Sequence, residues 1–439
     1  MQSVLENVLI SGMRCLRMIP PEVNTSTSSS RVSESADSAR LRGKRVATVV
    51  FSHYPSDPRP RRAAELLVQL GMNVEVLCLR HDESEPASEI HNGVSIRRIS
   101  LKRRRGGKFS YLYQYSAFLV ISFVALAFRS LTRRYALVHV HNMPDILVFA
   151  ALVPKLLGAK VVLDLHDPMP ELMMTIFGLK PESFGVRLTK KFERWSIYFA
   201  DAVLTVNQAC KKLFTARGCP PEKVHVVMNS PDERIFKYRD TQRTPIERSR
   251  GKPFIIMYHG SLVERHGLDI GVNALGIVKR TVPQAELRIY GQRTPFLEQV
   301  LNSLRGSGLE QSVRYLGPKT LEQIVEAIDE CDVGIIPNRR SIFTEINTPT
   351  RIFEYLSRGK PVIAPAAPGI RDYFSEAQLV FFELGDASDL ARNLEYVCLH
   401  PEQVEATVEL GRAVYRDHRW SAEQTKFTNL AGDLLTACN

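Results

Sequence analysis

The chain has 439 residues, which is too long for one hydrophobic core and predicts two domains with additional segments. Hydrophobic residues make up 44% and charged residues 24%, values that exclude a fibrous or wholly disordered protein. The seven cysteines show no CxxC or CxxH spacing, so neither a zinc site nor a disulfide framework is indicated and a reducing, cytoplasmic setting is expected.

The first 43 residues are expected to form a disordered N-terminal extension. MQSVLENVLISGMRCLRMIPP has no basic region before a continuous apolar core and no clear cleavage site, so a secretory signal is not expected. The next stretch, EVNTSTSSSRVSESADSAR, is polar and rich in serine and threonine, a composition typical of disorder.

A net charge of +11 raises the possibility of nucleic-acid binding, but the location of the charge argues against it. Residues 101–134 contain no acid and enclose the apolar run YLYQYSAFLVISFVALAF, residues 111–128. Eight basic residues flank it: Lys102, Arg103, Arg104, Arg105, Lys108, Arg129, Arg133 and Arg134. We expect an interfacial helix on an anionic membrane. A buried core helix and a membrane span are the alternatives.

From residue 44 to residue 232 the pattern alternates between strands and helices. Short β-branched runs predict seven strands: RVATVVF, NVEVLCL, VSIRRIS, ALVHVH, KVVLDLH, AVLTVN and KVHVVMN. Helix-length segments such as PRRAAELLVQLG lie between most of them. These residues are therefore predicted to form the first domain.

Residues 233–253 are polar and rich in turn formers, and they predict a linker. A second array at 254–410 has the strands FIIMYHG, ELRIYG, VRYLG, VGIIP, PVIAP and LVFFEL. The fold class is therefore α/β, with two doubly wound, Rossmann-like parallel sheets facing each other across a cleft. Residues 411–439 are expected to form a closing helix in which Trp420 packs.

Ligands of such sheets lie beyond the carboxyl ends of the strands. HGSLVERHGLD follows the strand FIIMY directly, so the backbone at Gly260 can approach a ligand closely. A helix that begins at about Gly267 would offer free amides to an anion. Arg265 supplies a fork-shaped cation suited to phosphate. The alternative is an ordinary turn between strand and helix. Neither GxGxxG nor GxxxxGKS is present.

The stretch NTPTRIFEYLSRGKPVIAP predicts a short helix before a strand. Thr348 is the expected N-cap and Pro349 the first helical residue, so free amides there would form a second anion site. Glu354 is the acid of this helix. It can bind a ligand or form surface ion pairs with Arg351 and Arg358.

Two further strand ends carry polar residues. VHVHNMPD places His139 and His141 on one strand face, with His141 nearer the carboxyl end. VVLDLHDPMPE contributes Asp164, His166 and Asp167. Packed core histidines and a charged loop are the alternatives. No third ligand is spaced to support a two-histidine metal site.

An ordered series of motifs resembles glycosyltransferase family 4, the retaining nucleotide-sugar transferases of GT-B fold. The series runs over about residues 44–430: HYPSDPRPRRAAELLVQLG, VHVHNMPD, VVLDLHDPMPE, YHGSLVERHGLD, LRIYG, VRYLG, CDVGIIPN and PTRIFEYLSRGKPVIA. The pairing of the last motif with HGSLVERHG makes the resemblance specific.

The resemblance implies roles for individual residues. Glu354 would hold the ribose hydroxyls of the donor, Arg265 would neutralise the leaving diphosphate, and His141 would lie beside the transferred sugar. Glu345 would contact the sugar, although eight residues separate it from Glu354 where many members have seven. The remaining donor-side residues are Gly260, Ser261, His266, Gly291, Thr348, Pro349 and Thr350. Ser261 and His266 stand where many members have arginine and lysine.

The proline-rich loop after the first strand and the end of the fifth are expected to position the acceptor. The residues concerned are Asp57, Arg59, Arg62, His166 and Asp167. The chain is thus expected to be a retaining, metal-independent transferase with no cofactor, which uses a nucleotide sugar and a lipid-linked or other saccharide acceptor for cell-surface polysaccharide. It would be cytoplasmic and peripheral on the membrane, with no nucleic-acid partner. A GT-B epimerase and an inactive sugar- or nucleic-acid-binding relative are the alternatives.

Overall fold

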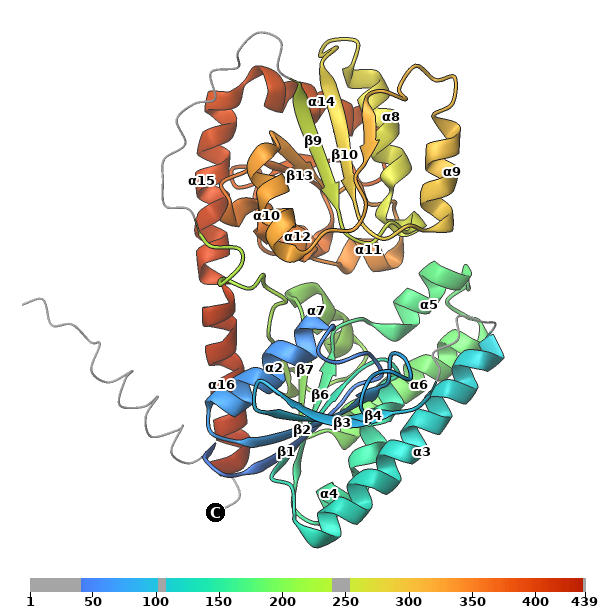
Figure 1. The fold of residues 1–439 in the computed structure, drawn as a ribbon, viewed down its shortest axis with the longest axis vertical. Coiled ribbons are helices and arrows are strands. Elements are labelled where there is room, and N and C mark those ends of the chain that lie inside the picture. Colours follow the sequence, from blue (N-terminus) through green and yellow to red (C-terminus); the bar gives the residue numbers. More distant parts are fainter. Residues whose placement is uncertain (1–40, 102–107, 239–252, 437–439) are drawn as a thin grey trace, which may run out of the picture. The chain divides into compact units, whose positions relative to one another are not determined.

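The computed structural model describes residues 41–101, 108–238 and 253–436 (Figure 1). The predicted extension at 1–43 and linker at 233–253 therefore lie largely outside the described residues. Leu41 is buried in the core of the first domain, so the packed chain includes residues before 44.

The first domain contains an eight-stranded sheet in the order β3-β4-β2-β1-β5-β6-β7-β8. Its strands are β1 Arg45–Val49, β2 Asn73–Leu79, β3 Ser88–His91, β4 Val94–Ile99, β5 Leu137–His141, β6 Lys160–Leu165, β7 Ala202–Thr205 and β8 Val224–Val226. All pairings are parallel except that of the edge strand β3 with β4. Strand β3 was not predicted, although the Asn92-Gly93 turn before β4 has positive φ at both residues and Asn-Gly is a known hairpin signal.

Two helical layers cover this sheet. Its helices are α2 Pro58–Gln69, α3 Lys108–Thr132, η1 Asp145–Ala151, α4 Leu152–Leu156, α5 Met169–Phe177, α6 Phe184–Phe199, α7 Gln208–Ala216 and η2 Pro221–Lys223. One core cluster joins α3, η1, α6 and α7 to the sheet, and another joins α2 and the C-terminal helix α16, Trp420–Thr436, to the opposite face (Figure 1). The strands are apolar on both faces because both faces are covered.

The second domain contains a six-stranded sheet in the order β11-β10-β9-β12-β13-β14. Its strands are β9 Phe254–His259, β10 Ala285–Tyr290, β11 Val313–Tyr315, β12 Val333–Ile335, β13 Val362–Pro365 and β14 Val380–Phe382. Every pairing is parallel. Together with the first sheet, this confirms the predicted α/β class with two parallel-sheet domains.

Helices also cover both faces of the second sheet. They are η3 Glu264–His266, α8 Leu268–Val278, α9 Pro295–Ser303, α10 Leu321–Glu330, α11 Ile342–Ile346, α12 Thr350–Ser357, α13 Pro368–Arg371, α14 Ala387–Leu399 and α15 Pro401–Asp417. A Cβ on Gly334 of β12 would lie 2.3 Å from the ring of Tyr355, so this glycine lets α12 pack closely on the sheet.

The C-terminal helix α16 packs on the first domain. Phe427, Leu430 and Leu435 are buried in the same core as α2, and Trp420 packs against it. The Arg62 guanidinium carbon lies 4.9 Å from the centre of the Trp420 ring. Trp420 therefore packs, as predicted.

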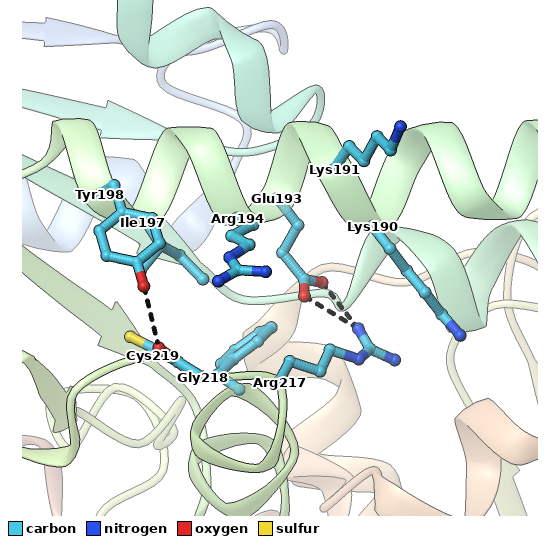
Figure 2. Close-up of a pocket in the computed structure, with 10 residues that line it drawn as sticks. Lys190, Lys191, Glu193, Arg194, Ile197, Tyr198, Arg217, Gly218 and Cys219 are labelled. Carbon is cyan, nitrogen blue, oxygen red and sulfur yellow. Dashed lines mark hydrogen bonds and ion pairs between the residues drawn. The ribbon is translucent and has the colours of Figure 1, made fainter.

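Three buried acids, Asp145, Glu171 and Glu193, share one cation in the first domain. Arg217 donates to Glu193 at 2.9 and 3.0 Å (Figure 2). It also binds Glu171. Burial raises the pKa of Glu193 to about 7 and that of Asp145 to about 6. The folded protein therefore holds protons that the unfolded chain has released, and this cluster favours folding less as the pH rises from about 4.5 to 7.

We expect Glu193→Gln to flatten this pH dependence. From pH 5 to pH 8 the melting temperature of the variant should improve relative to wild type by about 5–10 °C, since a pKa raised from 4.5 to about 7 corresponds to about 2.5 kcal/mol over this range, and 1 kcal/mol to about 2–4 °C in a domain of this length. Glu182→Gln, at an exposed acid before α6, serves as the control. Parallel melting curves for Glu193→Gln and wild type would contradict the raised pKa.

Candidate functional site

The turns after β9 and β10 lie against each other. Gly260 has φ of +123° and Gly291 has φ of +156°, and the Gly260 amide donates to Tyr290 O at 3.0 Å. A Cβ on Gly291 would lie 2.2 Å from Gly260 O. Both positions therefore require glycine, and two strand ends meet there as bare backbone.

The next residues form the single turn η3, which carries Arg265 and His266. Burial lowers the pKa of Arg265, and the negative charge of Asp167 in the first domain partly offsets this. The guanidinium lies 5.9 Å from the centre of the Phe343 ring, and no carboxylate pairs with it among the described residues. A half-buried arginine without an acid partner is suited to an anionic ligand.

His266 does not add a second charge to this turn. Its Nδ1 lies 2.8 Å from Ser261 O, to which the Nδ1–H donates. Burial and the charge of Arg351 lower the pKa of His266 to about 3, so the ring is neutral at pH 7. Ser261 itself is exposed. Helix α8 begins directly after Gly267, as predicted.

Helix α12 begins one residue later than predicted. Thr350 is its first residue, and Pro349 is extended and occupies the N-cap position. Thr348 is not the N-cap, because its hydroxyl donates to Gly369 O at 2.6 Å and accepts from Asn207 Nδ2 at 3.0 Å. No side chain caps the helix, so its first amides are available to an anion.

Glu354 does not form the surface ion pairs that its neighbours suggested. Arg358 binds Asp329 at 3.0 and 2.7 Å, and Arg351 Nη1 donates to His259 O at 2.7 Å. The ion-pair interpretation of Glu354 is therefore wrong.

The partner of Glu354 is His259, the last residue of β9. Its Nε2 lies 2.5 Å from Glu354 Oε2, and its Nδ1 lies 2.9 Å from the hydroxyl of Tyr355. The Tyr355 hydroxyl in turn donates to Met257 O at 3.0 Å. In the described chain, Glu354 Oε1 has no hydrogen-bond partner. One carboxylate oxygen is thus fixed to the sheet and the other remains free to accept from a ligand.

Arg351 is a site residue that the sequence analysis missed. It lies in the first turn of α12, where a cation is unfavourable beside the helix dipole unless an anion binds there. Its guanidinium lies 4.8 Å from the centre of the Tyr258 ring, and a Cβ on Gly260 would lie 3.4 Å from its Nη1. The Arg351 side chain therefore lies between the start of α12 and the turn after β9. Its position next to an uncapped helix start was the available signal.

Glu345 lies on α11, the short helix before α12. Its carboxylate is 38% exposed and lies 3.4 Å from Nη1 of Arg340. Arg340 also binds Glu383, so Glu345 is held at the edge of a small exposed ion network. Its proposed contact with the sugar stays a prediction.

The first domain forms hydrogen bonds with the start of α12 and with the segment before it. Asn207 follows β7 and donates to Ile346 O at 2.8 Å as well as to Thr348. The hydroxyl of Thr350 donates to Asn229 O at 2.9 Å. Asn207 was not predicted as a site residue, although it lies two residues after the end of the buried strand β7.

His141 is the last residue of β5 and has no exposed surface. Its Nδ1 lies 3.3 Å from Asp164 Oδ2, and its ring centre is 4.2 Å from that of His139. Burial, with the adjacent His139, lowers the pKa of His141 to about 4, so the ring is neutral at pH 7. The imidazole is enclosed by His139 and Asp164, and its expected place beside the sugar stays a prediction.

The two predicted acceptor-side arginines form buried hydrogen bonds within the first domain. Arg59 is buried and binds both oxygens of Asp164, with Nε–Oδ2 at 3.0 Å and Nη2–Oδ1 at 2.8 Å. Arg62 is buried too, and it binds Ser230 O and Asn229 Oδ1. Burial lowers the pKa of Arg62 to about 10.

Asp57 caps helix α2 by accepting from the Arg59 amide. Asp57, Arg59 and Arg62 therefore all have partners within the first domain, and their role toward an acceptor stays a prediction.

His139, His141 and Asp164 place their potential ligand atoms within 4.8 Å of one another, so a third possible metal ligand does exist beside the two histidines. Burial alone would raise the pKa of Asp164, but Arg59 and the two histidines hold it well below its usual range. A divalent cation would have to displace the Arg59 guanidinium. This donor set therefore fits an ion pair better than a metal.

His166 and Asp167 follow β6 and are partly exposed. The Asn142 side chain fixes this turn, because its Oδ1 accepts from the His166 amide at 3.2 Å and its Nδ2 donates to Asp167 O at 2.7 Å. Asn142 was not predicted. Of the predicted acceptor-side residues, these two have exposed surface near Arg265, on which the Asp167 charge acts.

Comparisons with known proteins agree with this arrangement. Residues 56–230 match the family model of the glycosyl transferase 4-like domain, and residues 253–399 match that of the glycosyl transferases group 1. Together the two models cover most of the chain.

Two curated relatives illustrate the similarity. The amylovoran biosynthesis glycosyltransferase AmsK of Erwinia amylovora is 26% identical over 39% of this chain and 40% of its own length. The sulfoquinovosyl transferase SQD2 of Arabidopsis thaliana is 24% identical over 66% of this chain and 55% of its own. The matched region thus spans about half the length of these relatives.

Solved structures share the fold. A sucrose-phosphate synthase from Thermosynechococcus elongatus has a TM-score of 0.72 at 16% identity and covers 90% of this chain and 100% of its own. HepE from Anabaena in complex with UDP has a TM-score of 0.66 at 15% identity, covering 89% and 100%. The fold is therefore GT-B, as predicted.

Proposed function

The chain belongs to the glycosyltransferases that join a 4-like domain to a group 1 domain, and on this premise we propose that it moves a sugar from a nucleotide diphosphate to an acceptor with retention of anomeric configuration. The observation that carries the proposal is the free oxygen of Glu354 beside the uncapped start of α12. A carboxylate next to an anion site matches the ribose and diphosphate of one nucleotide.

A nucleoside diphosphate sugar is the proposed donor. Glu354 Oε1 would accept from the ribose hydroxyls, and the α12 amides with Arg351 would meet the diphosphate. Structures of HepE, which has the same fold, are of complexes with UDP and with UDP-glucose. Gly260 and Gly291 would let the chain approach the donor as bare backbone.

The reaction follows from charge. The bond between the anomeric carbon and the phosphate oxygen breaks, and its electron pair passes to the diphosphate. The acceptor hydroxyl bonds to the same face of that carbon and gives its proton to the departing phosphate. Arg265 and the preorganised amides stabilise the developing negative charge, so we propose that no metal or cofactor is required.

A panel of nucleotide sugars, offered with and without bacterial-type lipid extract, tests this proposal. We expect release of free nucleotide that depends on both donor and extract. Isomerised donor without acceptor would indicate an epimerase of the same fold, and tight donor binding without turnover would indicate an inactive binding protein. Either result would contradict transfer.

Helix α3 supports a lipid-linked saccharide as the acceptor and a peripheral membrane location for the enzyme. Every fourth residue along the inward side of this helix is at most 3% exposed, although three of the five are polar. These residues are Gln114, Phe118, Ser122, Leu126 and Ser130. Its outward side carries large apolar residues, including Val120, Phe128 and Leu131, which are 59–70% exposed. A helix in water would have the opposite arrangement.

The helix is also long and apolar enough to span a membrane over Tyr113–Thr132, with 22% of that window buried in the protein. Its buried stripe packs on the sheet core, which favours a helix lying in the interface over a span. Of its predicted basic flank, Arg129 instead binds Glu75 at 3.1 Å, whereas Arg133 and Arg134 are exposed. An acceptor carried on a lipid would suit a domain held at the membrane, and the relatives named for amylovoran and colanic acid biosynthesis favour a cell-surface polysaccharide.

We expect Phe128→Ser with Leu131→Ser to weaken sedimentation with vesicles roughly tenfold or more, because burying each side chain contributes about 1.5–3 kcal/mol when complete. Replacing Arg103, Arg104 and Arg105 should release the protein from anionic vesicles at low salt. Leu399→Ser with Leu410→Ser, exposed on α14 and α15, is the control. If wild type stays in the supernatant under all conditions, the membrane location is wrong.

A further inference from the structure

The outer side of helix α6 carries aromatic and basic residues in one stripe. Its exposed residues recur at helical spacing: Phe184, Arg187, Lys191, Arg194, Trp195 and Tyr198. Phe184 is 73% exposed, Trp195 55% and Tyr198 54%. Aromatic rings with cations on a surface helix are typical of the boundary between lipid headgroups and acyl chains.

The charge of this stripe is uncompensated. Glu193 is the one acid of α6, and it is buried in its pair with Arg217. Lys190, Lys191 and Arg194 have no ion-pair partner in the part of the chain that the structure describes. The surface of α6 is therefore positive as well as aromatic.

A cavity of about 250 Å³ opens between α6 and the end of α7. Figure 2 shows Lys190, Glu193 and Arg194 projecting from α6 toward the segment from Arg217 to Cys219. Ile197, Phe214 and Cys219 form an apolar part of the wall. The volume is several times the ~30 Å³ of a water molecule. An apolar wall beside unpaired cations is suited to an anionic group attached to a hydrophobic molecule.

The cavity and α3 belong to the same helical layer. Helices α3, α6 and α7 share one core cluster on one face of the first sheet. Nine of the exposed large hydrophobic residues of the described chain lie on α3 and α6, and four more lie on α4 and α5, which come between them in the sequence. Helices α3 and α6 therefore both offer exposed apolar side chains to a membrane.

We propose that the cavity between α6 and α7 binds the phosphate headgroup of an anionic phospholipid, with Lys190 and Arg194 as its cations and Trp195 in the interface. This inference rests on the membrane contact of α3 proposed above. It adds a headgroup site, so that the lipid composition of the membrane controls how firmly the enzyme is held.

The test uses the full chain with Trp420→Phe, which leaves Trp195 as the sole tryptophan. Vesicles of phosphatidylcholine alone and of phosphatidylcholine with phosphatidylglycerol are titrated against tryptophan emission and sedimentation. We expect a blue shift of Trp195 and tighter binding to the anionic vesicles. Lys190→Ala with Arg194→Ala should reduce that preference roughly thirtyfold, since each basic residue near an anionic surface contributes about 1 kcal/mol.

Arg280→Ala with Arg305→Ala, at exposed positions of the second domain, removes the same charge and should leave the preference unchanged. The Phe128→Ser, Leu131→Ser variant should instead lose binding to both vesicle types. This result distinguishes the membrane contact of α3 from the headgroup site at α6, so the two proposals can fail separately. Wild-type preference in the Lys190, Arg194 variant would overturn the inference. So would a bound protein whose Trp195 emission does not move, or full competition by glycerol 3-phosphate, which would indicate a site for a free phosphate.

Discussion

Replacing Arg265 with alanine should reduce turnover by about a thousandfold, while the affinity for nucleoside diphosphate changes little. A cation that stabilises charge developing on the leaving group acts mainly in the transition state, and loss of one such donor typically costs 10²–10³ in kcat, or about 4 kcal/mol at the upper end. Arg265 is half-buried and has no carboxylate partner among the described residues, so its charge is not neutralised by the protein.

Initial rates of nucleotide release at saturating donor would measure this effect. Arg265→Lys keeps a charge without the planar fork and should recover part of the rate. Arg305→Ala, at an exposed arginine after α9, controls for the loss of a positive charge. A full rate for Arg265→Ala would remove this side chain from the chemistry and leave Arg351 as the cation of the site.

Replacing Glu354 with alanine should raise the dissociation constant for nucleoside diphosphate by about a hundredfold. Hydrogen bonds to a charged group contribute about 1.5–3 kcal/mol, and 1.4 kcal/mol is a factor of ten. The carboxylate is already oriented, because Oε2 is held by His259 while Oε1 is free. Ribose hydroxyls would therefore meet a fixed acceptor.

Calorimetric titration with the diphosphate would test this, together with the corresponding 2′-deoxy and 3′-deoxy nucleotides. The deoxy ligands should bind wild type more weakly but should bind Glu354→Ala as well as the parent nucleotide does. Glu345→Ala should leave nucleotide affinity nearly intact and affect only turnover, and Glu326→Ala, at an exposed acid on α10, is the control. Unchanged affinity in Glu354→Ala would restore a purely structural role for this residue.

Local patterns predicted most of the fold. Both arrays of strands appear where β-branched runs stand between helix-length segments, since parallel strands covered on both faces are apolar throughout. The one strand that was missed, β3, is polar and lies at an edge. Its Asn92-Gly93 turn was a local signal that was available.

The candidate site was predicted less completely, because long-range contacts decide which charges are free. Glu354 has arginines in neighbouring turns, yet its partner is His259, 95 residues away. The neighbours of Arg59 in the sequence are polar residues and prolines, yet its side chain pairs in the core with Asp164, which is 105 residues away. Spacing in the sequence indicates which side chains can meet on one helix. The pairs Glu354–His259 and Arg59–Asp164 instead depend on how a helix packs on a strand that is distant in the sequence.

The most direct test of glycosyl transfer is mass spectrometry of the acceptor. Wild-type protein and a nucleotide sugar with an isotopically labelled sugar would be incubated with bacterial-type lipid extract, alongside the Arg265→Ala variant. We predict one labelled glycosyl residue added to a lipid-linked saccharide in an α or β linkage that matches the donor, with the product nearly absent for the variant. Labelled free sugar or isomerised donor, with no labelled acceptor for any nucleotide sugar, would contradict the proposal.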